Sequence, residues 1–202
     1  MIDAIAEARE RLVSRARREG LATVGYAVLD SPLGPLWVAI GPRGITTIHY
    51  GAEPTAGELR RLLRVHGPGI VPDPRPAAPV ARQLEEYFTG KRHEFDLAVD
   101  LEGLTAFQRR VLAATARLRF GELATYATVA RGAGNGLASR AAGAALGANP
   151  VPIVVPCHRV VASDGTLGGY TGGLAAKRRL LAIERGEDVP AGGWPPMRRQ
   201  LS

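Results

Sequence analysis

Residues 150–161 read PVPIVVPCHRVV and include Cys157, the single cysteine of the 202-residue chain. A β-branched run bounded by prolines ends at this thiol, and a histidine and an arginine follow it directly. A free cysteine is most often a buried small hydrophobe, so these neighbours alone favour a packing role. A placed nucleophile is the competing interpretation, and the rest of the sequence must decide between the two.

A nucleophilic cysteine needs a base or a cation beside it, because a thiol with a pKa near ~8.5 is only a few per cent thiolate at neutral pH. His158 and Arg159 are the candidates. Adjacent residues of an extended strand point to opposite faces, so His158 can reach the sulfur only if the backbone turns after Pro156. A reactive Cys157 therefore requires a turn at this position.

Glu184 shifts the balance toward a nucleophile. It lies beside the apolar stripe of a helix predicted over residues 174–185, and not on the solvated face. A carboxylate in this position requires a partner, and the imidazole of His158 would give a Cys-His-Glu relay, with or without a bridging water. Pairing of Glu184 with Arg185 or Lys177 is the alternative.

The charge of the chain is unevenly distributed. Residues 1–103 contain 13 Lys and Arg against 14 Asp and Glu, a net charge of −1, whereas residues 104–202 contain 13 against 5, a net charge of +8. An Arg-rich proteome would raise both halves. The asymmetry therefore indicates that the C-terminal half binds a polyanion, and nucleic acid is the expected one.

Composition narrows the class of protein further. With 46% hydrophobic residues, the chain can bury a real core in one domain or two small ones. The N-terminus is rich in Arg and Glu, and no stretch approaches the ~18 apolar residues of a membrane span, so we expect a cytoplasmic protein without membrane contact. One cysteine excludes an intrachain disulfide and a Cys-rich zinc site, and the histidines lack metal-ligand spacing, so neither a metal nor a cofactor is expected.

The first half of the chain predicts a small α/β domain preceded by a helix. Residues 2–18 have amphipathic helical spacing, and we expect this helix to pack on the domain that follows. A segment dense in Pro and Gly covers residues 66–79, and a helical stripe resumes at Val80. Three short β-prone runs separated by turn residues predict an antiparallel meander: residues 26–29, 36–40 and 45–50.

The second half begins with a helix and continues with a helix-turn-helix pattern. Thr105 and Gln108 have the capping-box spacing of a helix start, and Gly121 predicts the end of that helix. Residues 125–131 and 137–146 are typical of two short helices joined by a Gly-rich turn, which indicates a helix-turn-helix.

The second of these short helices consists of small residues except for Arg140. Such a surface allows close approach to a nucleic-acid backbone, and it equally allows tight packing against a neighbouring helix. Because Arg140 has no acidic neighbour in its helix, we expect its side chain to contact DNA.

This ordered set of residues closely resembles the O6-alkylguanine-DNA alkyltransferases, also called methylated-DNA-protein-cysteine methyltransferases. The strong resemblance covers roughly residues 104–186, and residues 31–34 with the following strands resemble the family's N-terminal domain. It rests on residues 149–161 and 165–174, and on Phe107, Gln108, Val111, Leu112, Gly121, Glu122, Tyr126, Arg140, Ala141, Gly143, Lys177, Leu180, Leu181 and Glu184.

The resemblance implies a fold in two parts. The N-terminal part is a ribonuclease-H-like α/β domain, with a small antiparallel sheet and helices. The C-terminal part is a mainly α domain with a helix-turn-helix of the winged-helix type. The chain would divide into an N-terminal helical extension (1–20), the α/β domain (21–95), a linker (96–104), the DNA-binding and alkyl-transfer domain (105–189) and a flexible tail (190–202).

The resemblance also implies catalytic roles. Cys157 would accept the alkyl group, His158 would act as its base through water, and Glu184 would orient the histidine. Asn149 would support the active-site turn by hydrogen bonding. Tyr126 would donate toward the guanine as negative charge develops on the base.

Further residues would bind the DNA and the flipped base. Arg140 would occupy the hole left by the flipped nucleotide, Thr171 would meet the O6 edge of the base, and the Val160 carbonyl would read its exocyclic amine. Pro152 would line the alkyl pocket. The predicted set is completed by Ser139, Gly143 and Arg159.

One position departs from the family pattern. Many members have Pro before the arginine-bearing helix, where this chain has Gly136. Glycine fixes the backbone less strongly than proline, so we expect a looser start of this helix.

The implied function is DNA repair by one-time transfer of a methyl or other alkyl group from O6-alkylguanine in double-stranded DNA to Cys157, by a monomer that needs no cofactor. Whether O4-alkylthymine is also a substrate stays open. Two other classes compete. A non-catalytic DNA-damage-binding or regulatory helix-turn-helix protein would not need the cysteine, and a Cys-His hydrolase of acyl substrates would leave the basic half unexplained.

Overall fold

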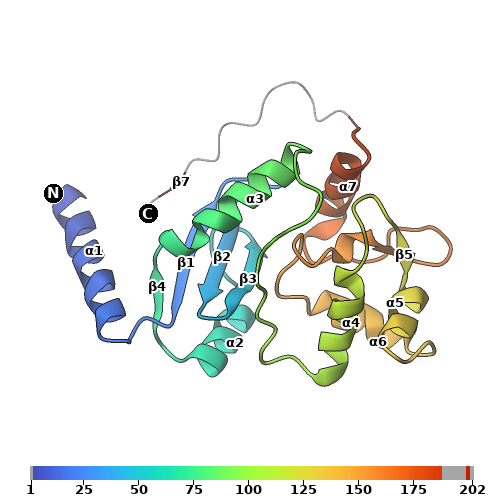
Figure 1. Cartoon of the computed structure of the whole chain (residues 1–202), viewed down its shortest axis with the longest axis horizontal. Helices are drawn as coiled ribbons and strands as arrows, with labels where there is room; N and C mark the ends of the chain where they lie inside the picture. Colours follow the sequence, from blue (N-terminus) through green and yellow to red (C-terminus); the bar gives the residue numbers. More distant parts are fainter. Residues whose placement is uncertain (1, 188–198, 201–202) are drawn as a thin grey trace.

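The computed structural model describes residues 2–187 and 199–200. The sheet-containing half of the molecule lies beside the helical half, and one extended segment connects them (Figure 1). Three strands form the predicted antiparallel meander: β1 (Val24–Leu29), β2 (Leu36–Gly41) and β3 (Gly44–Tyr50). β4 (Ile70–Pro72) pairs with β1 in parallel, so the sheet is mixed, with the order β3-β2-β1-β4.

The sheet carries a helix on each face. Leu36 and Val38 of β2 share a core with Leu84 of α3 (Ala78–Phe88), which follows the short 3-10 turn η1 (Arg75–Ala77). Trp37 and Ala39 instead share a cluster with Leu62 of α2 (Ala56–His66). Because alternate residues of a strand point to opposite faces, the continuous apolar run of β2 matches a strand that is covered on both sides.

α1 (Ile2–Arg18) forms where the spacing predicted it and extends away from the sheet (Figure 1). Its contact with the following domain lies in its C-terminal half, where Val13 is buried and Arg17 forms an ion pair with Asp73. Leu12, in contrast, is 67% exposed. Among the helix side chains that the structure describes, the predicted packing is seen at the end nearest the sheet.

The predicted C-terminal tail is described only in part. Arg199–Gln200 form β7, which pairs antiparallel with β1. The remainder of residues 190–202, including Trp194 and Arg198, lies outside the described residues.

The second half of the chain begins with α4 (Ala106–Ala116). Its capping box is the predicted one, because Thr105 Oγ1 accepts from Gln108 N–H at 3.2 Å and Gln108 Oε1 accepts from Thr105 N–H at 2.9 Å. The helix ends before Gly121. α5 (Tyr126–Gly132) and α6 (Ser139–Gly147) form the helix-turn-helix, and both pack against α4.

α6 begins at Ser139, later than the expected Leu137. Ala138 at the N-cap provides no side-chain hydrogen bond, and Leu137 is 98% exposed. The helix therefore begins without a side-chain cap. The remaining elements are β5 (Ala124–Thr125), which pairs in parallel with β6 (Val160–Val161), the 3-10 turn η2 (Cys157–Arg159) and α7 (Gly173–Glu184).

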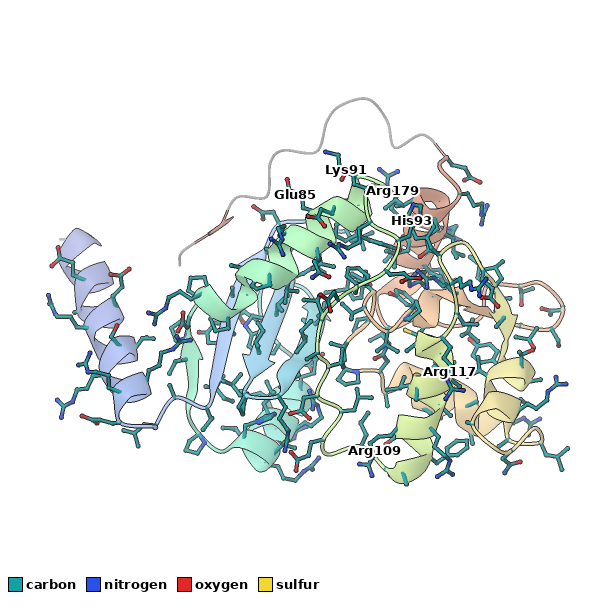
Figure 2. The ribbon with its side chains drawn as sticks, viewed as in Figure 1. Glu85, Lys91, His93, Arg109, Arg117 and Arg179 are labelled. Atoms are coloured by element: carbon teal, nitrogen blue, oxygen red, sulfur yellow. The ribbon has the colours of Figure 1, made fainter. Side chains whose placement is uncertain are left out.

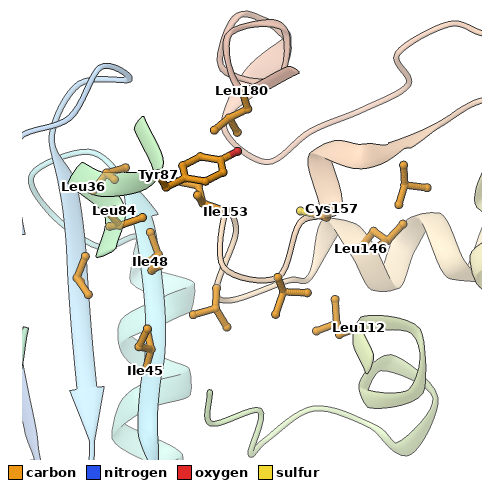
Figure 3. Packing of buried hydrophobic residues seen from close by; sticks show 14 of the residues in the cluster. Leu36, Ile45, Ile48, Leu84, Tyr87, Leu112, Leu146, Ile153, Cys157 and Leu180 are labelled. Atoms are coloured by element: carbon orange, nitrogen blue, oxygen red, sulfur yellow. The ribbon is translucent and has the colours of Figure 1, made fainter. Parts of the chain in front are cut away.

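One hydrophobic core runs through both halves and includes the cysteine (Figure 3). Tyr87 and Ile153 lie where the sheet side meets the helical side. A backbone hydrogen bond of 2.8 Å from Ile48 N–H in β3 to the Pro150 carbonyl ties the sheet edge to the segment that precedes Cys157. The sheet thus supports the loop that carries the thiol. Within the described part of the chain, no helix is long and apolar enough to cross a membrane.

Candidate active site

The backbone turns at Cys157, as a reactive thiol requires. η2 begins at this residue directly after Pro156, and Cys157 is only 5% exposed. Asn149 holds the turn: its Nδ2 donates to the Val155 carbonyl at 2.9 Å and to Cys157 Sγ at 3.1 Å, while its Oδ1 accepts from Val151 N–H at 3.0 Å. One amide side chain therefore fixes both the loop and the sulfur.

Ile153 lies in the same loop with an unusual backbone conformation. Its φ is +75° and its side chain is fully buried. The left-handed region is unfavourable for a β-branched residue, at a cost on the order of 1–3 kcal/mol. The hydrogen bonds of Asn149 and the link from Ile48 to Pro150 hold the loop in this shape.

The thiol is protonated at rest. Burial raises the pKa of Cys157 to about 11, and the hydrogen bond from Asn149 and the positive charge of Lys177 offset only part of this effect. At neutral pH the sulfur is therefore a neutral thiol. It becomes a strong nucleophile only if a base removes its proton.

His158 and Glu184 form a buried pair. His158 Nε2 lies 2.8 Å from Glu184 Oε1, and both side chains are almost fully buried. Because a carboxylate only accepts, Nε2 carries the proton, which leaves a lone pair on Nδ1. Burial lowers the pKa of His158 despite the hydrogen bond to Glu184. Nδ1 has no hydrogen-bond partner among the described residues, so it can accept a proton.

Arg159 occupies a different place from the one predicted at the DNA. Its side chain is 6% exposed, its Nε donates to Glu184 Oε2 at 3.0 Å, and a terminal nitrogen donates to Glu184 Oε1 at 2.8 Å. The other terminal nitrogen donates to the Leu118 carbonyl at 2.6 Å. A buried guanidinium that forks onto a carboxylate does not fit a phosphate contact, so we correct the DNA-binding assignment of Arg159.

Glu184 is held as an anion. Burial alone would raise its pKa, but the hydrogen bonds from His158 and Arg159 and the positive charge of Arg159 lower the pKa well below its usual range. Two more donors come from distant segments: the Tyr87 hydroxyl at 2.7 Å and Gly121 N–H at 3.0 Å. Tyr87 belongs to the apolar helical stripe that the sequence predicted from Val80 onward. Its position in that stripe carries no signal of a contact with a residue 97 positions away.

A pair of tyrosines, Tyr50 and Tyr170, joins the sheet to the site. The hydroxyls of Tyr50 and Tyr170 lie 2.6 Å apart, and burial raises the pKa of both, so both remain protonated. Sequence reasoning had assigned neither residue to the site. Tyr170 stands within the family-like segment 165–174, which was the available signal; Tyr50 offered none.

Lys177 is a fully buried cation that holds the loop beyond the thiol. Its Nζ donates to the carbonyls of Val160, at 2.6 Å, and of Leu167. Burial lowers its pKa. The ammonium thereby fixes the segment between β6 and α7 and adds positive charge near the sulfur.

A cavity of about 440 Å³ opens beside the sulfur. This volume lies within the range of small-molecule pockets. Its wall is formed by Tyr126, Gly143, Leu146, Gly147, Cys157, Gly169, Tyr170 and Thr171. The structure thus brings four predicted site residues together, namely Cys157, Tyr126, Thr171 and Gly143. Pro152 and Val160 are buried and are not part of this wall, although the Val160 carbonyl is held by Lys177.

Tyr126 stands at the start of α5, with its ring in the cavity wall. Burial raises its pKa, and the nearby Cys157 acts in the same direction, so the hydroxyl is protonated and can donate. The loop that carries Gly168 approaches Tyr126 closely, because a Cβ on Gly168 would lie 2.5 Å from the Tyr126 hydroxyl. Gly168 also has a φ of +65°, so glycine is required there on two grounds.

The tight packing predicted as one interpretation of the small residues of α6 is seen on one face of the helix. Ala142 and Ala145 are buried, so one face packs tightly, while Arg140 is exposed on the other and forms no hydrogen bond or ion pair within the described ranges. Ser139 is half-buried at the helix start. Other cations of the basic half project from α4 and α7, as the labelled Arg109, Arg117 and Arg179 show in Figure 2.

Comparisons with known proteins agree with this arrangement. Residues 106–186 match the 6-O-methylguanine DNA methyltransferase, DNA binding domain, and residues 24–101 match the 6-O-methylguanine DNA methyltransferase, ribonuclease-like domain. The chain belongs to the 6-O-methylguanine DNA methyltransferase family. The first half of the chain, with most of the connecting segment, corresponds to the ribonuclease-like domain, and the helical half corresponds to the DNA binding domain.

Individual members of the 6-O-methylguanine DNA methyltransferase family align over most of the chain. A methylated-DNA-protein-cysteine methyltransferase of Mycolicibacterium paratuberculosis is 41% identical over 80% of this chain and 93% of its own length. One from Methanosarcina barkeri is 38% identical over 79% of this chain and 96% of its own. The structure of Mycobacterium tuberculosis OGT in complex with DNA has a TM-score of 0.70 and 37% identity, covering 81% of this chain and 94% of that chain.

The described residues were also searched for metal-binding clusters. No group of three or more His, Cys, Asp or Glu side chains in residues 2–187 and 199–200 could hold a metal ion. The site consists of a thiol, an imidazole-carboxylate pair, a tyrosine hydroxyl and a cavity, which is a set suited to nucleophilic displacement.

Proposed function

We propose that this protein repairs double-stranded DNA by transferring a methyl or other alkyl group from O6 of guanine to Cys157 Sγ, once per molecule. The observation that carries the proposal is the position of Cys157. Its sulfur lies at the wall of the cavity and accepts a hydrogen bond from Asn149, and it is followed by a neutral His158 held by Glu184.

The substrate base has to leave the duplex to reach this sulfur. A stacked guanine cannot present its O6-alkyl carbon in line with a buried thiol, so the nucleotide flips into the cavity at a cost of about a few kcal/mol. α6 carries the exposed Arg140, which would fill the hole in the stack. Ser139 and Gly143 would allow the helix to approach the backbone, and Gly143 already faces the Tyr126 ring at the cavity.

The chemical step is a direct displacement at carbon. His158 Nδ1 takes the thiol proton, directly or through water, and the thiolate then attacks the alkyl carbon. The S–C bond forms as the C–O6 bond breaks, and the electron pair of that bond stays on the guanine oxygen. Tyr126 donates a proton toward the guanine anion. One proton leaves the thiol and one reaches the base, so the charges balance.

Single turnover follows from the product. The alkyl group becomes part of a thioether on Cys157, and no residue of the site offers a route to cleave an S–C bond. The displacement itself consumes no cofactor. The spent protein therefore carries its product permanently, and repair is stoichiometric.

The remaining roles belong to the same proposal. Thr171 would contact the O6 edge of the base, the Val160 carbonyl its exocyclic amine, and Pro152 would shape the space for larger alkyl groups from behind the wall. The α/β domain (21–95) supports the site and the domain of residues 105–189 performs the transfer. We assign the activity to a monomer in the cytoplasm, where the thiol stays reduced.

A duplex that carries isotopically labelled O6-methylguanine tests the proposal. Mixing it with the protein should move label to the peptide containing Cys157 in a burst of one group per chain, and Cys157→Ser should bind the duplex without accepting label. Label on the Cys157→Ser variant, or transfer beyond one group per chain, would overturn the mechanism. Tight binding of the alkylated duplex with Cys157 unmodified would instead favour the non-catalytic DNA-damage-binding protein.

A further inference from the structure

Tyr87 brings the N-terminal α/β domain into the His158–Glu184 pair. The residue lies near the end of α3 and is fully buried. Its hydroxyl donates to Glu184 Oε1 at 2.7 Å, the same oxygen that accepts from His158, and lies 3.4 Å from His158 Nε2. The tyrosine therefore contacts the acceptor of the histidine and approaches the histidine itself.

The ring of Tyr87 is held so that the hydroxyl cannot turn away. Phe88, Phe95 and Phe120 surround it at centroid distances of 5.5, 5.2 and 5.9 Å. Burial, together with the negative charge of Glu184, raises the pKa of Tyr87 well above its usual value. The hydroxyl thus stays protonated and acts as a fixed donor.

A fixed donor on Glu184 Oε1 has two effects on the histidine. It holds the carboxylate in place, so that the His158 ring keeps one orientation. It also takes up part of the negative charge of the carboxylate, which would otherwise stabilise an imidazolium. Both effects keep Nδ1 unprotonated and in position.

We propose that Tyr87 is a positioning residue for alkyl transfer: by donating to the Glu184 oxygen that holds His158, it keeps the imidazole neutral and aligned to take the Cys157 proton. This inference rests on the proposed function. The N-terminal domain would then influence the rate of transfer through one hydroxyl group, that of Tyr87.

Other ionisable groups face the same pair and must be considered with Tyr87. They are Cys157 and Arg159 from η2, Lys177 from α7, and Tyr170 from the loop between β6 and α7. The two cations disfavour an imidazolium, and Glu184 favours it. Loss of the Tyr87 hydroxyl leaves these groups in place and removes one donor from the carboxylate.

The test compares Tyr87→Phe with the intact protein across a pH series. Transfer needs neutral His158, so the rate falls on the acid side, at a pH below the ordinary histidine value of about 6.5. In Tyr87→Phe the imidazolium becomes more stable, so this fall should move to higher pH by roughly one unit or less, and the rate on the plateau should drop roughly twofold to tenfold. NMR of isotope-labelled histidine should report the same upward shift in His158 protonation.

Phe88→Leu is the matched control. It removes one of the three rings around Tyr87 and leaves Phe95, Phe120 and the hydrogen bond to Glu184 to hold the hydroxyl, so it should lower the urea midpoint without moving the acid fall of the rate. If Tyr87→Phe changes the pH profile and the His158 signals no more than Phe88→Leu does, Tyr87 is only a packing residue and the inference fails. If the intact protein transfers no alkyl group, the proposed function fails, while the His158 signals still decide whether Tyr87 positions the imidazole.

Discussion

The Tyr50 and Tyr170 hydroxyls lie 2.6 Å apart, although 120 residues separate the two tyrosines in the chain. Tyr50 ends β3, and Tyr170 forms part of the cavity wall. The chain after Tyr170 also passes close to Tyr50, because a Cβ on Gly172 would lie 2.6 Å from the Tyr50 ring. The sheet therefore sets the position of a wall that a guanine base would have to meet.

Tyr50→Phe removes this hydrogen bond and should lower the free energy of unfolding by about 1 kcal/mol, the usual contribution of a buried hydrogen bond. It should also slow alkyl transfer, since Tyr170 loses its partner. Urea unfolding and the labelled-duplex assay measure the two effects. Tyr26→Phe is the control, because the Tyr26 hydroxyl makes no hydrogen bond within the described residues. Equal stability of the two variants would contradict the role of the pair.

Asn149→Asp replaces the amide that donates to the sulfur with a carboxylate. A negative charge beside Sγ should raise the pKa of Cys157 further above about 11, so alkylation by iodoacetamide at mildly alkaline pH should slow by roughly tenfold or more. Asn135→Asp keeps its acceptor for Leu137 N–H and serves as the control. A rate for Asn149→Asp that matches this control would show that the amide does not tune the thiol.

Arg140→Ala should separate DNA engagement from chemistry. Arg140 is exposed on α6, away from the buried pair, so its loss should reduce transfer from duplex DNA by roughly tenfold to a hundredfold, as expected for a contact of about 1–3 kcal/mol. Transfer from free O6-benzylguanine should remain normal. Arg64→Ala on α2 provides a control for the general loss of positive charge. An equal loss with both substrates would place Arg140 in the chemical step.

Lys177→Met should destabilise the protein by about 2–3 kcal/mol, because buried carbonyls of Val160 and Leu167 lose a charged donor. The loop between them should become more mobile, which amide hydrogen exchange would detect. Lys91→Met, at an exposed lysine labelled in Figure 2, should stay within about 0.5 kcal/mol of the parent. Similar effects at both lysines would rule out the inferred role of the buried ammonium.

Stability should fall as the pH drops below neutrality. The pKa of His158 is lowered by burial, so the unfolded chain takes up its proton first, and stability is lost once the pH falls below about 6.5. The pKa of Glu184 is also lowered, so its contribution is present above the unfolded value of about 4.3 and is lost on further acidification.

Urea midpoints measured over this pH range check the prediction. His158→Gln should flatten the first part of the fall, and His66, whose pKa burial also lowers, should account for part of the remainder. A flat profile for the parent protein down to about pH 5 would argue against a buried neutral His158.

Local signals explain how much of the fold was predictable. The capping box at Thr105 and the short β-prone runs of the meander depend on neighbouring residues, and both form as expected. Thr55 and Glu58 have the same capping-box spacing, so the start of α2 was also predictable from neighbouring residues. β4 was missed for a physical reason: its parallel pairing with β1 joins segments far apart in the chain and leaves no local pattern.

The site residues also divide into those with a local sequence signal and those without one. Cys157, His158 and Glu184 were predictable because two are adjacent and the third lies beside an apolar stripe. The exception was Arg159, which the family resemblance placed at the DNA, whereas its buried side chain is paired with Glu184. Tyr50 and Tyr87 contact the site only through the packing of two domains, which no spacing reveals.

The burial of Cys157 has a further consequence for a molecule that can act only once. Every side reaction with a peroxide, a disulfide or a stray electrophile would waste a whole protein chain. A thiol that is 5% exposed and has a pKa near 11 presents almost no thiolate to such reagents. Low intrinsic reactivity is therefore what gives this protein a long working life, since its one sulfur is preserved until a substrate occupies the cavity beside it.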